Sequence, residues 1–128
     1  MRSARDSTEE EASTEAGIYA AMDLLGQRWV LRVIWELEPG PLGFLELRRR
    51  MGNCSSSVLA DRLNALSRAG IVEKLPDKAY ELTAHRGVAL GAALEGLWQW
   101  AEVNAEALTG GPRRRQEAGV AQNARRRS

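Results

Sequence analysis

The chain has few of the side chains that most often carry metal sites and nucleophilic catalysis. Its 128 residues include one cysteine, Cys54, and one histidine, His85. A single cysteine cannot form an intrachain disulfide, and one histidine with one cysteine provides neither a metal-ligand cluster nor a nucleophile paired with a base. No apolar run approaches the roughly eighteen residues of a membrane span. These absences argue against an enzyme, a cofactor or metal site and a membrane protein, and they favour a reducing, cytoplasmic setting.

The net charge of +1 conceals an uneven distribution along the chain. Residues 1–16 hold two arginines and five acidic residues with no apolar run behind them, so they do not resemble a secretory signal. Residues 109–128 hold six arginines and one glutamate. We interpret 1–16 as a disordered acidic tail, 17–108 as one domain and 109–128 as a disordered arginine-rich tail. The second tail either adds sequence-independent attraction to phosphates or only solubilises the chain.

Apolar residues recur at helical spacing in the first half of the domain. One set stops at Gly26 and the next stops before Pro39, so each indicates a core-facing helix. A short third helix from Phe44 to Met51 precedes Ser55, which stands at the N-cap position of a fourth helix. This pattern predicts a helix-turn-helix, in which the second helix is capped by Ser55. The apolar faces of the first, second and fourth helices are Ile18, Ala21, Met22 and Leu25, then Trp29, Val30, Val33, Ile34 and Leu37, then Leu59, Leu63 and Leu66.

A hairpin and a last helix are expected after the fourth helix, which ends at Gly70. Residues 71–74 and 79–83 indicate two strands, with the turn residues Pro76 and Asp77 between them. Residues 85–107 indicate a helix that ends before the Thr-Gly-Gly-Pro sequence at 109–112. This order predicts an α+β, mainly helical fold, a winged helix-turn-helix. Because a domain of this size has a thin core, we also expect a homodimer.

The fourth helix has the properties of a helix that enters the major groove of duplex DNA. Opposite its leucines lie short or polar side chains, Ser57, Asp61, Asn64 and Arg68, which permit close approach to base edges. Free N–H groups at the helix start favour an anionic oxygen there. We expect Asp61 to pair with a neighbouring arginine, Arg62 or Arg68. The predicted DNA-binding residues are Ser55, Ser56, Ser57, Arg62, Arg48, Arg49, Arg50, Lys74 and Lys78.

Each of these features also has an ordinary structural explanation. A serine-rich N-cap occurs on many helices that never contact DNA, and an arginine run after an apolar face is more often a solvated surface than a phosphate clamp. The order of the elements changes this balance. In a winged helix-turn-helix, the arginine run and the hairpin Lys78 flank the same groove.

Four tryptophans are an unusual aromatic choice for a chain with one phenylalanine and two tyrosines. We expect Trp29 and Trp35 to pack in the core. Trp98 and Trp100 lie two positions apart, so they cannot share a helix face, and we expect one in the core and one across a dimer interface. An aromatic effector pocket is the alternative.

Four segments between residues 18 and 104 resemble the HxlR-type bacterial regulators, winged-helix proteins related in architecture to the MarR group. Met-Asp-Leu-Leu-Gly-Gln-Arg-Trp at 22–29 is similar to the family's Asp-Leu-Ile-Gly-Gly-Lys-Trp, and Gly-Pro-Leu-Gly-Phe-Leu-Glu-Leu-Arg at 40–48 to its Gly-Pro-x-Arg-Phe-x-Glu-Leu-Arg. Residues 55–63 resemble its Ser-x-x-x-Leu-x-x-Arg-Leu, and Gly-Ile-Val at 70–72 with Tyr-Glu-Leu-Thr at 80–83 resemble its two strands.

The resemblance implies a homodimer built from the first and last helices, a recognition helix in each major groove, and control of transcription initiation. N- and C-terminal dimerisation helices therefore complete the expected fold. The expected interface residues are Ile18, Met22, Leu94, Leu97, Trp98, Trp100 and Ala101.

Departures from the family pattern limit what the resemblance implies. No cysteine stands at 14–17, ahead of the first helix, so the thiol-based sensing of some members does not carry over. Cys54 occupies an apolar position of the family's inter-helix turn and is expected to pack in the interior, with redox sensing as the alternative. Gly43 replaces a basic residue and Leu45 a polar one, which weakens the expected phosphate grip. The segment 82–87 is one residue longer than the family's Leu-Thr-x-x-Gly.

Three hypotheses follow. The chain is a sequence-specific DNA-binding regulator that acts as a homodimer. Alternatively, it is a regulator that responds to a small molecule bound between its dimer helices. In the third hypothesis, it is a winged-helix protein-interaction module that no longer binds DNA.

Overall fold

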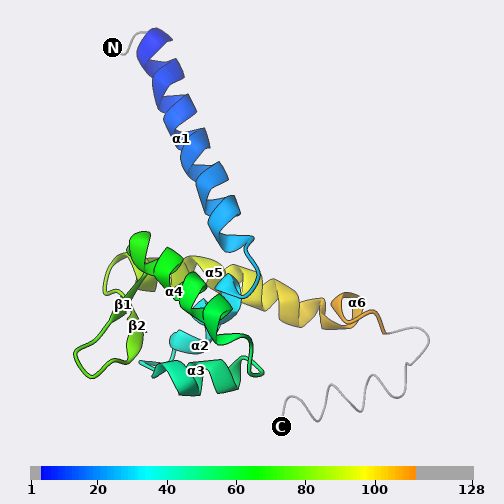
Figure 1. Cartoon of the computed structure of the whole chain (residues 1–128). Coiled ribbons are helices and arrows are strands. Elements are labelled where there is room, and N and C mark those ends of the chain that lie inside the picture. Colours follow the sequence, from blue (N-terminus) through cyan, green and yellow to red (C-terminus); the bar gives the residue numbers. More distant parts are fainter. Residues whose placement is uncertain (1–3, 112–128) are drawn as a thin grey trace. The chain divides into compact units, whose positions relative to one another are not determined.

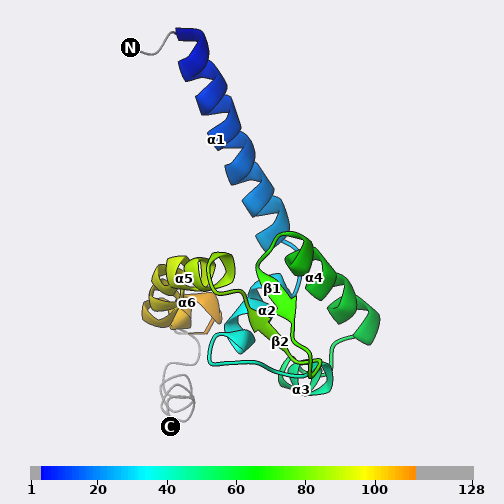
Figure 2. The ribbon, with the colours of Figure 1, turned by 90° about the vertical axis from the view of Figure 1, so that its left-hand side faces the viewer.

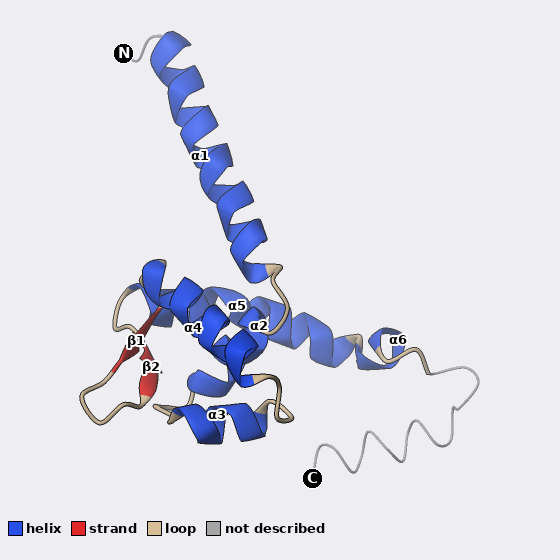
Figure 3. Ribbon diagram, in the orientation of Figure 1, coloured by secondary structure: helices blue, strands red, loops and turns tan. Residues whose placement is uncertain are grey.

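The computed structural model describes residues 4–111 (Figure 1). Contacts divide the chain into two units, Met1–Gly91 and Ala92–Ser128. Most of the described chain is helical, with one small sheet, as the sequence predicts (Figure 3). The elements are α1 (Ala4–Leu25), α2 (Val30–Leu37), α3 (Phe44–Arg50), α4 (Ser56–Arg68), β1 (Val72–Lys74), β2 (Tyr80–Leu82), α5 (Arg86–Val103) and α6 (Ala105–Leu108).

The core of the first unit lies where α2 contacts α3, α4 and β2. One face of α2 is fully buried, as its apolar spacing predicts. Burial of each large apolar side chain stabilises the fold by about 1.5–3 kcal/mol relative to exposure, so α3 and α4 are held chiefly by this contact. The core side chains are Val30, Val33, Ile34, Leu37, Leu47, Met51, Leu59, Leu63, Leu66, Ile71 and Val72.

Both ends of α4 are capped. The Ser55 side chain accepts a hydrogen bond from the Val58 N–H, as expected of an N-cap serine. At the other end Gly70 has a φ of 76°. Its N–H donates to the Ser67 carbonyl at 3.0 Å, and the Ile71 N–H donates to the Leu66 carbonyl at 2.9 Å, which is a Schellman motif. The predicted bounds of this helix are confirmed.

The wing is an antiparallel hairpin in which Val72 pairs with Leu82 and Lys74 with Tyr80 (Figure 2). Its turn closes through a hydrogen bond from the Leu75 N–H to the Ala79 carbonyl at 2.7 Å. The sequence did not indicate a third pairing. Leu42, ahead of α3, exchanges two backbone hydrogen bonds with Tyr80, at 2.8 and 3.0 Å, and ties the base of the helix-turn-helix to the wing.

The prediction of a disordered acidic tail over 1–16 is wrong for residues 4–16, which are the first part of α1. Alanine and glutamate are strong helix formers, and acidic side chains near a helix start interact favourably with its dipole. The expectation that α1 faces the core is also wrong. Ile18 and Met22 are more than half exposed, and every side chain from Thr8 to Asp23 is exposed.

The last predicted helix, 85–107, is interrupted at Asn104. The Asn104 side chain donates to the Trp100 carbonyl at 2.8 Å, and Asn104 itself, with φ −105° and ψ 22°, departs from helical geometry between α5 and α6. The predicted arginine-rich tail lies almost wholly outside the described residues, because these end at 111. Within 4–111, no helix has both the length and the apolar character needed to cross a bilayer.

Candidate nucleic-acid interface

The outer face of α4 is exposed in the described part of the chain. Ser57, Asp61, Asn64 and Arg68 are all exposed, whereas the leucines on the opposite side are buried. The division predicted from the helical repeat is therefore confirmed. These four exposed side chains include one acid and one base. The first turn of α4 carries only small side chains. Such a face can approach the edges of base pairs closely without a charged group in the first turn.

The three serines at the start of α4 differ in their roles. Ser55 has a structural role, because its hydroxyl accepts the Val58 N–H and lies 3.0 Å from the Ser57 hydroxyl. Ser56 and Ser57 are exposed within the first turn of the helix. A hydroxyl both donates and accepts, so these two side chains can bond to phosphates or base edges. We therefore expect Ser56 and Ser57 to be the better contact residues.

Arg62 holds a loop, a role that the sequence did not indicate. Its Nε donates to the Arg28 carbonyl at 2.7 Å, which fixes the segment between α1 and α2 against α4. The same guanidinium lies 4.0 Å from the Asp61 carboxylate, so the expected pairing of Asp61 with an arginine is present as a long contact. Part of the Arg62 guanidinium is therefore already bonded within the chain and is not available to a phosphate.

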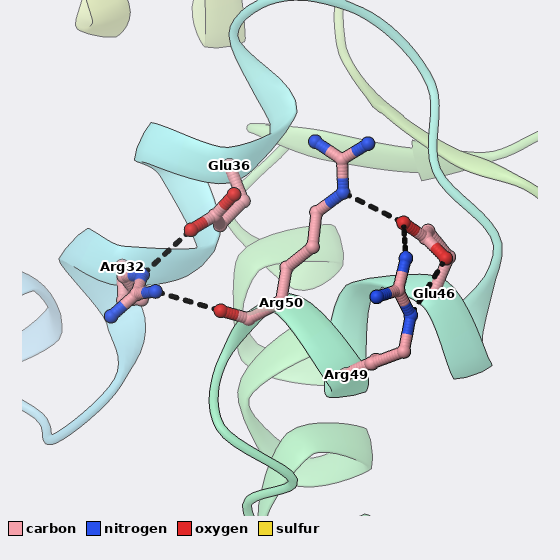
Figure 4. A network of polar contacts seen from close by, with 5 residues as sticks. All are labelled: Arg32, Glu36, Glu46, Arg49 and Arg50. Atoms are coloured by element: carbon pink, nitrogen blue, oxygen red, sulfur yellow. Dashed lines mark hydrogen bonds and ion pairs between the residues drawn. The ribbon is translucent and has the colours of Figure 1, made fainter. Parts of the chain in front are cut away.

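The three arginines at 48–50 on α3 also have hydrogen-bond partners within the chain; Figure 4 shows those of Arg49 and Arg50. The Arg48 Nε donates to the Cys54 carbonyl at 2.5 Å and fastens α3 to the turn before α4. Arg49 and Arg50 both bond to the Glu46 carboxylate, with Arg50 Nε 2.9 Å from Oε2. These hydrogen bonds lower the pKa of Glu46 to about 2. One negative charge therefore offsets part of the predicted phosphate clamp.

Two further arginines lie beside the predicted cations. The Arg32 Nη2 donates to the Arg50 carbonyl at 2.7 Å, and its Nε bonds to Glu36 at 2.7 Å (Figure 4). Arg28, whose carbonyl accepts the hydrogen bond from Arg62, lies with its guanidinium over the ring of Trp29, 5.1 Å from the ring centre. Trp29 has a φ of 80°, a left-handed conformation that is uncommon outside glycine. Helical spacing gave no signal for Arg28 or Arg32, because their place beside α3 and α4 depends on tertiary contacts.

The wing has more acidic than basic side chains. Lys74 lies over the Tyr80 ring, 5.6 Å from its centre, and Lys78 is exposed in the turn with a φ of 75°. Against them, Glu73 pairs directly with Glu81 across the hairpin. Loss of hydration at Glu81, with Glu73 and Asp77 nearby, raises the pKa of Glu81. Two like charges opposite each other destabilise a hairpin and weaken its attraction for phosphate.

A groove of about 490 Å³ runs between the start of α3 and the wing. Leu45, on its lining, is 76% exposed. Gly43, also on its lining, has open space where a side chain would begin, with no atom within 4 Å. The site therefore has room for the basic residue that the family pattern places there.

The predicted interface residues fall into three groups. Ile18, Met22, Leu97 and Trp100 are exposed, and Trp98 and Ala101 are half-buried. Leu94 is 9% exposed, so it belongs to the interior of the single chain and offers little surface to a partner. Tyr19 and Val103 were not predicted but are also exposed.

The remaining sequence expectations concern Trp29, Trp35 and Cys54. Trp29 is half-buried, so it packs only partly in the core. Trp35 is 49% exposed, so its predicted place in the core is wrong. It follows α2's buried Ile34 and therefore points to a different side of the helix. Cys54 is buried, in agreement with the packing interpretation. Among residues 4–111, no group of three or more metal-ligating side chains comes together.

A helix-turn-helix with a capped second helix, followed by a two-stranded wing, defines the class of winged helix-turn-helix proteins. The family model described as "HxlR-like helix-turn-helix" matches residues 24–109. The chain belongs to this family.

Known proteins of this class are similar to the chain. The HTH-type transcriptional regulator YvaP of Bacillus subtilis is 33% identical over 87 residues, which cover 63% of this chain and 80% of that protein. The crystal structure of quinone-bound YodB from B. subtilis has a TM-score of 0.62 at 35% identity and covers 67% of this chain and 94% of that one. A putative MarR-family regulator from Enterococcus faecalis has a TM-score of 0.62 at 29% identity, over 74% and 91% of the two chains.

Proposed function

We propose that the chain binds duplex DNA as a homodimer, with α4 of each protomer in a major groove, and thereby regulates transcription in the cytoplasm. The observation that supports this most strongly is the outer face of α4. Its first turn carries Ser56 and Ser57, which are both exposed. Membership of a family of helix-turn-helix regulators supports the same function.

The geometry accounts for how such a complex forms. An α-helix of 13 residues is about 20 Å long, and its diameter of about 10–12 Å fits a major groove about 12 Å wide when its leading side chains are short. The positive end of the helix dipole then faces phosphate oxygens. The guanidinium groups of Arg49 and Arg50 retain a net positive charge after Glu46 is counted, so α3 attracts the backbone beside the groove.

Selection from a random duplex pool tests the DNA-binding proposal. Two half-sites with two-fold symmetry should be enriched, with centres about 34–36 Å apart or a multiple of this distance. The affinity for the enriched duplex should fall as salt rises, with a slope set by the number of neutralised phosphates. If no duplex is enriched or bound even at low salt, the chain is instead a protein-interaction module.

The homodimer is supported by the apolar side chains that α1 and α5 leave exposed. α1 is 22 residues long, and Ile18, Tyr19 and Met22 on it are each more than half exposed. On α5, Trp100 and Val103 are exposed as well. Apolar surface of this kind is stable in water chiefly when a partner covers it.

A charge placed on α1 tests the homodimer. The Met22→Glu substitution should produce monomers in sedimentation velocity experiments, because it would bury a carboxylate without a partner. Leu45→Glu is the matched control, since Leu45 is an exposed apolar residue on α3, and it should leave the dimer intact. A Met22→Glu protein that sediments as the wild type would contradict this interface.

The same helices support a small-molecule effector. Trp98 is half-buried and Trp100 exposed, so a ligand bound beside them would change tryptophan fluorescence. YodB has been crystallised with a quinone, whereas this chain has no cysteine at 14–17, so its ligand would bind without a thiol there. A ligand that quenches fluorescence and changes duplex affinity would support the proposal. Quenching with unchanged affinity would contradict it.

A further inference from the structure

The end of α4, the start of the wing and the start of α5 are fastened together by one short segment, 83–86. Three successive carbonyl oxygens after α4 accept hydrogen bonds from it. Arg86 Nη1 donates to the Ala69 carbonyl at 3.1 Å, and the Thr83 hydroxyl donates to the Gly70 carbonyl at 2.7 Å. The Thr83 N–H donates to the Ile71 carbonyl at 2.9 Å. We call this set of contacts the α4 clasp.

Two glycines of the α4 clasp are in close contact with their neighbours, although Arg86 itself is exposed and the segment lines an open hollow of about 510 Å³. Gly70 lies against the Arg86 guanidinium so closely that a side chain there would collide with it. A side chain at Gly87 would collide with the Ile71 carbonyl and with Leu82. The Gly87 N–H also donates to the Thr83 hydroxyl at 2.8 Å, so the first turn of α5 is tied to the same point. The exit of α4 is therefore held in one position relative to the wing and the start of α5.

Arg86 contributes a charge at a favourable place. The last carbonyls of a helix carry its negative partial charge, and Ala69 is the C-cap residue of α4. A cation there adds a charge-assisted hydrogen bond to an otherwise neutral cap. Arg86 stands three residues after Thr83, where the similar family segment Leu-Thr-x-x-Gly has its glycine. The charged member of the clasp thus coincides with a departure from the family pattern.

We propose that Arg86 is a positioning residue for DNA recognition, because it fixes the C-terminal end of α4 and thereby sets where Ser56 and Ser57 lie in the groove. A tilt of about 10° at the exit of a helix about 20 Å long moves its start by more than about 3 Å. Such a displacement is several times the width, about 0.5 Å, of the distance range over which N–H···O hydrogen bonds form. The inference rests on the proposed DNA-binding function.

The test compares Arg86→Met with the wild type on two duplexes, the sequence enriched by selection and an unrelated sequence. Methionine keeps most of the length of arginine but cannot donate a hydrogen bond. Affinity for the enriched duplex should fall by about tenfold, whereas affinity for the unrelated duplex and the salt slope should stay unchanged. Arg86→Lys, which keeps the charge, should recover part of the loss. Arg5→Met removes one positive charge elsewhere and serves as the control.

The outcomes separate three explanations. If Arg86 instead contacts phosphate, Arg86→Met weakens binding to both duplexes and lowers the salt slope by about one. Unchanged affinity for the enriched duplex likewise overturns the inference but leaves the DNA-binding function standing. Failure of the wild type to bind any duplex overturns both. Thr83→Val, which removes the hydroxyl of the same clasp, is the second variant in case Arg86→Met does not fold, and the same selective loss is expected.

Discussion

The helix-turn-helix and the wing differ in how their charged side chains are used. On α3 and α4, the cations outnumber the acids, and the first turn of α4 carries no charge. On the wing, Glu73, Asp77 and Glu81 outnumber Lys74 and Lys78. Because phosphate repels carboxylates, we propose that the helix-turn-helix makes the main contacts with DNA and that the wing contributes less.

The largest expected change in duplex affinity comes from adding a cation at the start of α3, which increases the charge difference between the helix-turn-helix and the wing. Gly43→Arg fills open space on the rim of the groove and supplies the basic residue that the family pattern has there. One additional neutralised phosphate should raise affinity on the order of tenfold at about 0.1 M salt and steepen the salt slope by about 0.9. Filter binding or fluorescence anisotropy measures both quantities. Gly17→Arg, another open position, is the charge-matched control and should have little effect.

Removing the acid from the arginine cluster should have a smaller effect in the same direction. In the Glu46→Gln protein, Arg49 and Arg50 lose the carboxylate that they share and become available to phosphate. Duplex affinity should rise by roughly threefold to tenfold, with a steeper salt dependence. Glu95→Gln on α5 makes the same change of charge away from the site. Lower affinity in Glu46→Gln would mean that Glu46 positions the arginines for binding.

The smallest effect is expected from the wing, as a dependence of stability on pH. Because the pKa of Glu81 is raised in the folded state, the folded chain binds this proton more tightly than the unfolded chain does. Stability should therefore decrease as pH rises from the ordinary glutamate value of 4.5 through the raised value. Glu81→Gln should remove this dependence and raise the melting temperature on the order of 2 °C at pH 7. If the melting temperatures of Glu81→Gln and the wild type differ by the same amount at pH 4 and at pH 7, this account is contradicted.

Local signals in the sequence predicted the helix-turn-helix well, because each boundary has its own chemistry. Ser55 caps α4, and Gly70 takes the left-handed conformation that ends it. The start of α1 was missed, because its first part has almost no apolar residues and looked like a solvated tail. An alanine- and glutamate-rich segment can be helical without an apolar face, so periodicity gives no indication of it.

The predicted site residues were harder to assign, because their roles depend on neighbours distant in sequence. Arg62 binds the Arg28 carbonyl and Arg48 binds the Cys54 carbonyl, so both stabilise the fold. The pairing of Leu42 with Tyr80 joins segments almost forty residues apart. Sequence patterns showed which residues are polar and which helix carries them. They did not show which of those polar groups already have partners within the chain.

The central claim, that the first turn of α4 enters the major groove, is tested most directly by a charge placed on Ser57. Ser57→Glu would bring a carboxylate against phosphates and base acceptors, and affinity for the selected duplex should fall about a hundredfold or more. Ser67→Glu, at an exposed serine near the other end of the same helix, should lower it by less than about threefold. Circular dichroism should show both variants folded. Equal affinities for the two variants would contradict the assignment of α4 as the recognition helix.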